Sequence, residues 1–431
     1  MPEPKTETSA GHSWYDQPFW LTFSFGVVIS SVTAGLLWPF MVKTADATYY
    51  VAIAEGRWNE VFSPFSKRLL HPLLARLLTH FGVSLDAAFR IWAVLGLVLF
   101  FLLLALLLKR TGGTSAAIVV YIASPAIAKM FTDYYMCDLL HACLTAVYLI
   151  VLSSRYRLAS AMLLPVLLLA RESSIVLAII VIIVALVRRY EMLATTTFIG
   201  LLVGLILSAT LSARGGANIH HIPDWLYYVL KIPNNIAWNV MGLRFWTNTQ
   251  IAFNPCKPIW TVELPRGWPT GSIKTVGYCF FDATIPVRNA CTIMGIFGIL
   301  PVLIMLRPRQ FRLLQLIKAG DLIVCVAAVY GSVALFVSIL GGNDVARYAT
   351  YAWPLFFISL PVVYRTTPTV FWRFALVANV IFTTLLLTWG HLGVSARFEL
   401  AATVAVVLTT YAFSLRMMAR QLRPELAASL L

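Results

Sequence analysis

Carboxylates and arginines in this sequence gather beside the ends of long apolar runs, and these are the residue types that acid–base and phosphate chemistry require. Asp46 follows the first run, in the segment TADATYYVAIAEGRW (44–58). Carboxylates at the ends of the apolar runs are Asp46, Glu55, Asp133, Asp138, Glu172 and Asp344. A carboxylate can take the proton of an attacking hydroxyl group. Ionisable groups at membrane depth are costly and mark sites or pathways.

Cations suited to a phosphate accompany these carboxylates. Arginine makes bidentate contacts with phosphate and stabilises the negative charge of a leaving phosphate. The candidates for phosphate binding are Arg68, Arg171 and Arg347, with Lys67 and His71 beside Arg68. These residue types suit a site that combines one base with several phosphate ligands.

Composition decides which kind of scaffold positions these residues. The chain has 431 residues, 60% of them hydrophobic and only 12% charged, with a mean hydropathy of +0.81. Charged residues make up about a quarter of a soluble globular chain. We therefore expect an all-α polytopic membrane protein that contacts the lipid bilayer. The net charge of +15 lies in short clusters between apolar runs, which indicates membrane orientation rather than nucleic acid as a partner.

Apolar runs of membrane-crossing length predict about twelve transmembrane helices. These are 19–41, 88–108, 115–131, 136–152, 156–170, 173–187, 192–212, 290–306, 321–340, 349–364, 371–390 and 398–415. The pair 156–170 and 173–187 alternatively forms one bent element. Basic clusters in alternate short loops favour a cytoplasmic location for those loops and both termini. All six carboxylates then lie on the opposite, extracytoplasmic face.

Three regions follow from this arrangement. Residues 1–212 form a membrane module whose first outer loop, 42–87, carries two juxtamembrane amphipathic helices, at 46–60 and 66–82. Residues 213–289 form an extracytoplasmic loop or cap with a helix and a short hairpin. Residues 290–431 supply C-terminal transmembrane helices. Within the cap, Cys256 and Cys279 can pair as a disulfide or stay apart.

Four segments resemble the GT-C superfamily of integral-membrane glycosyltransferases. The first is Asp46 with YYVAIAEGRW (49–58) and FSPFSKRLLHPLL (62–74), which resembles the first outer loop of that superfamily. The others are CDLLHACLTAVYL (137–149), LLLARESSIVL (167–177) and GGNDVARYATYAWPLF (341–356). They occur in the superfamily's order and span most of the chain.

The resemblance implies a sugar transferase of the bacterial inner membrane. Its donor would be a polyprenyl-phosphate-linked sugar, its acceptor a hydroxyl of a glycan, glycolipid or protein, and its stereochemical course inverting. By position, Asp46 would be the catalytic base and Asp138, or else Asp133, the second acidic residue. Arg68, His71, Arg171, Glu172, Asp344 and Arg347 would bind the substrate and its phosphate.

Each candidate also has a purely structural interpretation. Asp46 and Asp138 can cap helices. Arg171 with Glu172, and Asp344 with Arg347, can each form a local ion pair. A divalent cation requires several oxygen ligands, and the first-loop motif has a single aspartate, so we expect no obligatory metal, although Asp46 and Asp138 together can form such a site.

Two other functions fit the same spans. A transporter or flippase for a lipid-linked substrate needs polar residues in the middle of several spans, where this sequence is almost purely aliphatic at 95–107, 175–186 and 198–210. A non-enzymatic subunit of a membrane assembly would leave the aspartates dispensable. The sugar, the acceptor and the linkage are not encoded in any recognisable pattern.

Overall fold

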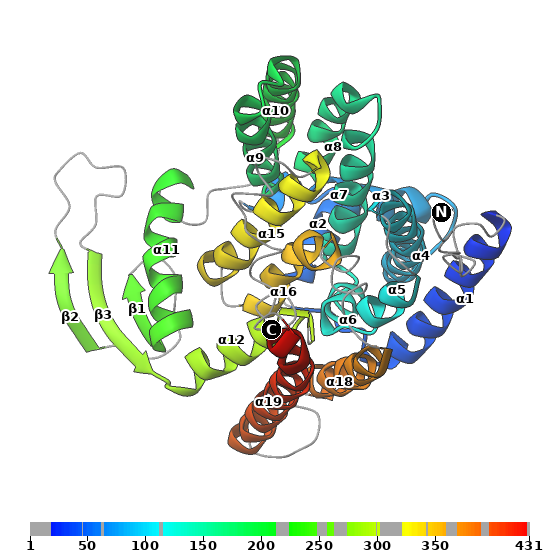
Figure 1. The fold of residues 1–431 in the computed structure, drawn as a ribbon. Helices are drawn as coiled ribbons and strands as arrows, with labels where there is room; N and C mark the ends of the chain where they lie inside the picture. The colour runs from blue at the N-terminus through cyan, green and yellow to red at the C-terminus, as the bar shows by residue number, and fades with distance from the viewer. Residues whose placement is uncertain are drawn as a thin grey trace.

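The computed structural model describes residues 19–44, 46–61, 64–111, 115–212, 224–247, 257–262, 274–298, 300–301, 321–341, 344–358, 369–388 and 396–428. This part of the chain is mostly helical (Figure 1). The short helix α16 (Val345–Ala349) lies near the middle of the view and contacts α6, α12 and α15. Residues far apart in the sequence therefore meet around α16.

The first outer loop contains the two helices that its amphipathic pattern predicts. Both α2 and α3 are short, and each buries residues at helical spacing, such as Tyr50 and Ile53 on α2 and His71 and Ala75 on α3. The elements of this region are α1 (Phe19–Leu37), η2 (Trp38–Phe40), α2 (Ala47–Ala54), η3 (Trp58–Glu60), η4 (Phe65–Lys67), α3 (Leu70–Thr79) and α4 (Leu85–Thr111).

The next region departs from the predicted spans at 115–131, which is two helices and not one. Ser124 has an extended backbone (φ −72°, ψ 148°) and Pro125 begins the second helix, because a residue before proline disfavours the helical conformation. The elements are α5 (Ser115–Ile122), α6 (Pro125–Thr132), α7 (Asp138–Leu152), η5 (Arg157–Leu163), α8 (Leu164–Ala170), α9 (Ser174–Val187) and α10 (Glu191–Ser212). Helices α8 and α9 are separate, with a turn at residues 171–173.

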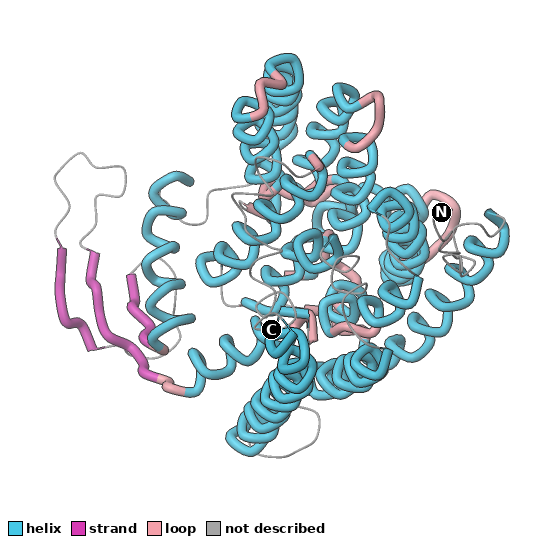
Figure 2. The backbone as a smooth tube through the Cα atoms, in the orientation of Figure 1, coloured by secondary structure: helices cyan, strands magenta, loops and turns pink. Residues whose placement is uncertain are grey.

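Residues 224–281 contain a three-stranded sheet, where the sequence predicted a helix and a short hairpin within an otherwise all-α protein. Helix α11 (Asp224–Met241) precedes strands β1 (Leu243–Thr247), β2 (Lys257–Val262) and β3 (Lys274–Phe281). They pair antiparallel in the order β1-β3-β2 (Figure 2). Register pairs include Leu243 with Phe281 and Val262 with Lys274. β-Branched and aromatic residues favour strands. Cys256 lies outside the described residues, so the structure does not decide whether it pairs with Cys279.

The C-terminal region returns to helices, of which α12 and α15 contact α16. They are α12 (Thr284–Gly295), α15 (Leu322–Gly341), α16, η6 (Thr350–Ala352), α18 (Thr369–Thr388) and α19 (Ala396–Ala428). Helical residues 353–358 follow η6. In Figure 1, α18 and α19 extend away from the α8, α9 and α10 end of the molecule.

Several helices have the length and composition of membrane spans, as a helical membrane protein requires. Five are long enough: Phe23–Phe40, Leu85–Leu108, Glu191–Ser212, Leu322–Leu340 and Phe398–Arg416. Shorter apolar helices cover Asp138–Leu152, Arg157–Ala170, Ser174–Val187 and Arg373–Thr388. Large apolar side chains on α10 are exposed, among them Phe198, Ile199, Val203 and Ile206, a surface suited to lipid. The total of about twelve spans stays a prediction.

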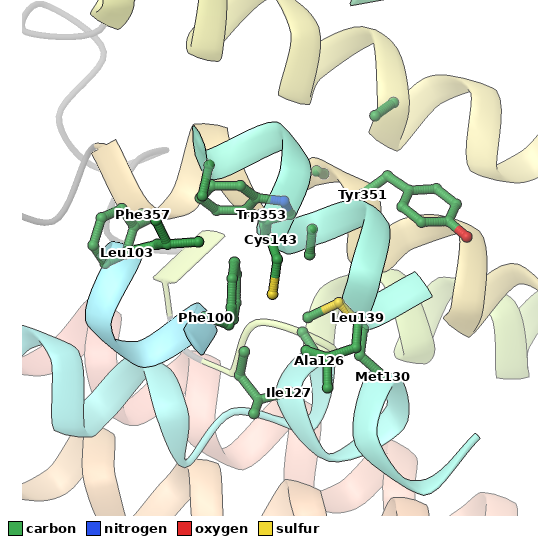
Figure 3. Close-up of a cluster of buried hydrophobic side chains, with 14 of the residues drawn as sticks. Phe100, Leu103, Ala126, Ile127, Met130, Leu139, Cys143, Tyr351, Trp353 and Phe357 are labelled. Carbon is green, nitrogen blue, oxygen red and sulfur yellow. The ribbon is translucent and has the colours of Figure 1, made fainter. Parts of the chain in front are cut away.

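A buried aromatic cluster lies directly beside the candidate site (Figure 3). Phe100 on α4 packs edge-on against Trp353, with ring centroids 5.1 Å apart. Leu139 and Cys143 on α7 and Ile127 on α6 also belong to it. Tyr351 lies at its edge, and its hydroxyl points away from the cluster. The packed core thus fixes the tyrosine ring and leaves its hydroxyl available to polar groups.

Candidate active site

Asp138 is the centre of an ion-pair network that joins three distant parts of the chain. It is the first residue of α7 and is 1% exposed. Its Oδ1 accepts hydrogen bonds from Arg171 Nη1 and from the Tyr351 hydroxyl, and its Oδ2 lies 3.0 Å from Arg347 Nε. A buried carboxylate is costly unless it is paired and hydrogen-bonded, and two arginines and a tyrosine meet that need.

Arg347 connects Asp138 to Asp46. Its Nη1 donates to Asp46 Oδ2 at 3.1 Å, across 301 residues of sequence. The Asp46 side chain is 39% exposed, whereas that of Arg347 is 6% exposed. Although Asp46 precedes α2, its side chain makes no capping hydrogen bond. The purely structural interpretation of Asp46 as a helix cap is therefore wrong, and its carboxylate is open to a ligand.

Local folding of α16 explains why Arg347 faces these carboxylates. Asp344 caps the helix, and its Oδ1 accepts a hydrogen bond from the backbone N–H of Arg347 at 3.1 Å. The side chains of Asp344 and Arg347 do not form the local ion pair that the sequence offered as an alternative. Instead, the Asp344 carboxylate lies 3.2 Å from Lys129, and the Arg347 guanidinium is free to bridge Asp46 and Asp138.

Arg68 and Glu172 form a second pair beside the network. Arg68 Nε donates to Glu172 Oε2 at 2.8 Å, and Arg68 Nη2 contacts Oε1. Arg68 Nη1 also donates to the Tyr50 hydroxyl at 3.3 Å. The expected alternative of a local pair between Arg171 and Glu172 is wrong, because each binds a partner from another part of the chain. Burial raises the pKa of Glu172, but Arg68 outweighs it and lowers that pKa to about 2.

Lys129 and Asp133 extend the network beyond Asp344. Lys129 Nζ lies 3.0 Å from Asp133 Oδ2. The Asp133 side chain is 5% exposed, and this burial raises its pKa to about 6 although Lys129 opposes the shift. Asp133 is therefore near Asp344 and not beside Asp46, which makes Asp138 the better match to the second acidic residue.

Arg171 has donors to spare. Its guanidinium stacks 4.3 Å from the Tyr351 ring centroid. Nη1 is committed to Asp138, yet Nε and Nη2 are buried and have no hydrogen-bond partner in the described part of the chain. An unpaired buried donor costs about 1–3 kcal/mol, and an anionic ligand would remove this cost.

Two cavities flank α16 and η6. The first cavity, about 340 Å³, is lined by Arg68, Arg171, Glu172, Tyr348 and Tyr351 together with aliphatic side chains such as Val176, Ile232, Ala334, Val337 and Leu340. The second cavity, about 530 Å³, is lined by Lys129, Arg288, Asn289, Thr292 and Asp344 together with apolar side chains such as Ile296, Phe382, Leu385 and Leu386. Asp344 lines the second cavity, and Tyr348, four residues later in the sequence, lines the first.

His71 is the one predicted site residue that the network leaves out. It is 4% exposed, its ring lies 5.1 Å from Phe89, and its Nε2 is 3.2 Å from the Tyr134 carbonyl oxygen. Burial lowers its pKa to about 4. These contacts hold the His71 ring apart from the ion-pair network, and its binding of phosphate stays a prediction.

Sequence reasoning missed three side chains that complete the site. Tyr351 lies within the quoted segment 341–356, and Lys129 stands one helical turn before Asp133, which is the spacing of an ion pair. Tyr50 lies within the first-loop motif. Tyr351 and Tyr50 lie within the segments that carry the resemblance, and Lys129 lies within the predicted span 115–131. The local sequence pattern did not distinguish any of the three from its neighbours.

The chemistry of the site is that of an anion held by cations beside an accessible carboxylate. In the described residues, no group of three or more histidine, cysteine, aspartate or glutamate side chains is arranged to hold a metal ion. Comparison with known proteins adds no assignment: no family model, curated protein or solved structure matches the chain. The function therefore has to be argued from the geometry of this site.

Proposed function

We propose that the protein transfers a sugar from a polyprenyl-phosphate donor to an acceptor hydroxyl at the extracytoplasmic face of a bacterial inner membrane. The observation that carries the proposal is the first cavity, whose lining combines Arg68 and Arg171 with an aliphatic wall. An amphiphile with a phosphate at one end and a hydrocarbon chain at the other has these two requirements. The resemblance to the GT-C superfamily supports the same substrate class.

The two acidic residues then have different roles. Asp46 is the more accessible of the two carboxylates that Arg347 holds, and it serves as the base. Asp138 is enclosed by Arg171, Arg347 and Tyr351, so it acts as a positioning residue that keeps both guanidinium groups in place.

The reaction is a single displacement. The acceptor oxygen forms a bond to the anomeric carbon while the bond from that carbon to the phosphate oxygen breaks. The hydroxyl proton passes to Asp46, and polyprenyl phosphate leaves with the electron pair. Arg171 and Arg347 stabilise the charge that develops on the leaving phosphate. No metal ion is needed for this balance, because the arginines supply the positive charge.

Lipid analysis of cells tests the proposal against its alternatives. Cells lacking the protein are complemented with the wild type, Asp46→Asn or the control Glu55→Gln, an exposed carboxylate at the other end of α2. Asp46→Asn is expected to leave the intact donor lipid accumulated and the acceptor unmodified, as in the deletion strain. Glu55→Gln restores the wild-type lipid profile. A wild-type profile with Asp46→Asn would indicate an assembly subunit, and donor trapped on the cytoplasmic leaflet would indicate a flippase.

A further inference from the structure

The second cavity carries a cation, Arg288, that forms no ion pair with a carboxylate in the described part of the chain. Arg288 lines this cavity at the start of α12. Lys129, its neighbouring cation, pairs with both Asp133 and Asp344. Arg288 has no ion pair within the described ranges. Its guanidinium is therefore the group in this cavity that can accept an external anion.

The opposite wall of the second cavity is apolar. Phe382, Leu385 and Leu386 come from α18, and Ile296 follows α12. A free anion gains nothing from such a wall, and a purely apolar ligand gains nothing from Arg288. A ligand with an anionic group and a hydrocarbon part uses both. The volume, about 530 Å³, is in the range of ligand pockets, about 300–1,000 Å³, and fits a head group with the first part of its chains.

The first and second cavities are both lined by residues of the segment 344–351. Asp344 lines the second cavity, while Tyr348 and Tyr351 line the first. Between them on the same short segment, Arg347 holds Asp46. A ligand in each cavity would thus flank the α16 segment, as a two-substrate transfer requires.

We propose that the second cavity binds the acceptor, and that the acceptor is an amphiphile with an anionic group recognised by Arg288. The assignment of this ligand as the acceptor rests on the proposed function. The binding of an anionic amphiphile in the second cavity does not. Thr292, on the same helix as Arg288, donates its hydroxyl proton to the Arg288 carbonyl oxygen, and its hydroxyl oxygen can accept a hydrogen bond from the remainder of the head group.

Protection of Cys291 from alkylation measures occupancy without any activity assay. Cys291 lines the second cavity and is 9% exposed, the most accessible of the described free cysteines. The full chain, in nanodiscs of neutral lipid, is treated with N-ethylmaleimide, and labelling of Cys291 is followed by peptide mass spectrometry. The probes are phosphatidylglycerol, neutral monoolein and inorganic phosphate.

Phosphatidylglycerol is expected to slow Cys291 labelling at least fivefold, while monoolein and inorganic phosphate leave it within twofold. Arg288→Gln should abolish this protection without changing the rate in neutral lipid. The control Arg373→Gln removes an exposed arginine of α18 that does not line the cavity, and it should retain the protection. Equal protection by monoolein, or protection by inorganic phosphate alone, would overturn the proposal, as would no protection by any probe.

Asp46→Asn separates this inference from the proposed function. If the second cavity binds an anionic amphiphile, Asp46→Asn keeps the protection of Cys291 even though sugar transfer is lost. If Asp46→Asn keeps both the protection of Cys291 and unimpaired sugar transfer, the second cavity is still a binding site for an anionic amphiphile. Its role as an acceptor site would then be contradicted.

Discussion

Arg347 serves two carboxylates that differ in exposure. It binds the enclosed Asp138 through Nε and the accessible Asp46 through Nη1. One planar guanidinium with donors in a fixed fork can do this, whereas a lysine ammonium offers a single point of charge. The position of Asp46 relative to the arginines thus depends on Arg347, and the position of Arg347 depends on Asp138.

Asp138→Asn is therefore expected to destabilise the fold as well as the site. It leaves Arg171 and Arg347 buried with less compensation, and breaking a buried ion pair costs about 3–5 kcal/mol. The thermal midpoint in detergent should fall by several degrees. Glu55→Gln, which alters an exposed pair with Arg57, should leave it nearly unchanged. A wild-type midpoint for Asp138→Asn would show that the network does not hold these helices.

Asp133 gives the fold a pH dependence of defined sign. Burial raises its pKa from 3.8 to about 6, so the folded state binds this proton more tightly than the unfolded chain does. The resulting penalty is absent below pH 4, grows between pH 4 and 6, and is complete above pH 6. It amounts to about 3 kcal/mol, since one pKa unit corresponds to about 1.4 kcal/mol.

Asp133→Asn removes that penalty. The difference in free energy of unfolding between the variant and the wild type should therefore increase as pH rises from 4 to 6 and level off above. Taking the difference cancels the contribution of His71. Its lowered pKa makes the free energy of unfolding rise with pH in both proteins. A difference that does not vary with pH would mean that the carboxyl of Asp133 is not desolvated.

At the scale of elements, the sequence indicates where polar ends of helices occur but not which of them meet. The predicted acidic residues Asp46, Asp138 and Asp344 do lie around one site, as expected from their common side. Their partners were not predictable, because Arg347 and Asp46 are 301 positions apart and no local period links them. The same holds for Tyr351, whose hydroxyl reaches Asp138 from another helix.

Secondary structure shows the same division. Apolar runs locate α4, α10 and α15 closely, because their composition alone requires burial or lipid. The sheet of β1, β2 and β3 was only partly expected, as a hairpin, since the pairing of β1 with β3 crosses a long connection. The proline at position 125 indicates a helix break, but the apolar residues on both sides led to the prediction of one continuous span.

Close packing of α10 against η5 and α8 depends on glycine. A Cβ at Gly200 would collide with the backbone carbonyl of Ala161, and one at Gly204 would approach Pro165. Small residues let helices in membranes approach closely. Gly200→Ala should therefore lower the thermal midpoint in detergent. Gly35→Ala on α1, where a Cβ meets nothing within 4 Å, should leave it unchanged or raise it, because alanine is the better helix former. Equal midpoints for both variants would contradict this contact.

At the scale of the whole molecule, two cavities meet at one ion-pair network. The lining of the first combines Arg68 and Arg171 with an aliphatic wall, and that of the second combines Arg288 with an apolar wall. Exposed apolar side chains on α10 fit a surrounding bilayer. In the proposed function, the chemistry belongs to Asp46, the accessible carboxylate that Arg347 holds.

Single-turnover transfer by purified protein tests that assignment most directly. Wild type, Asp46→Asn and Glu55→Gln are mixed with a panel of polyprenyl-phosphate sugars and a lipid extract from cells lacking the protein, and sugar transfer and donor binding are measured separately. We expect Asp46→Asn to bind donor as the wild type does but to transfer sugar at least about a thousandfold more slowly, since it lacks a general base, while Glu55→Gln matches the wild type. Transfer by Asp46→Asn at the wild-type rate would contradict the account.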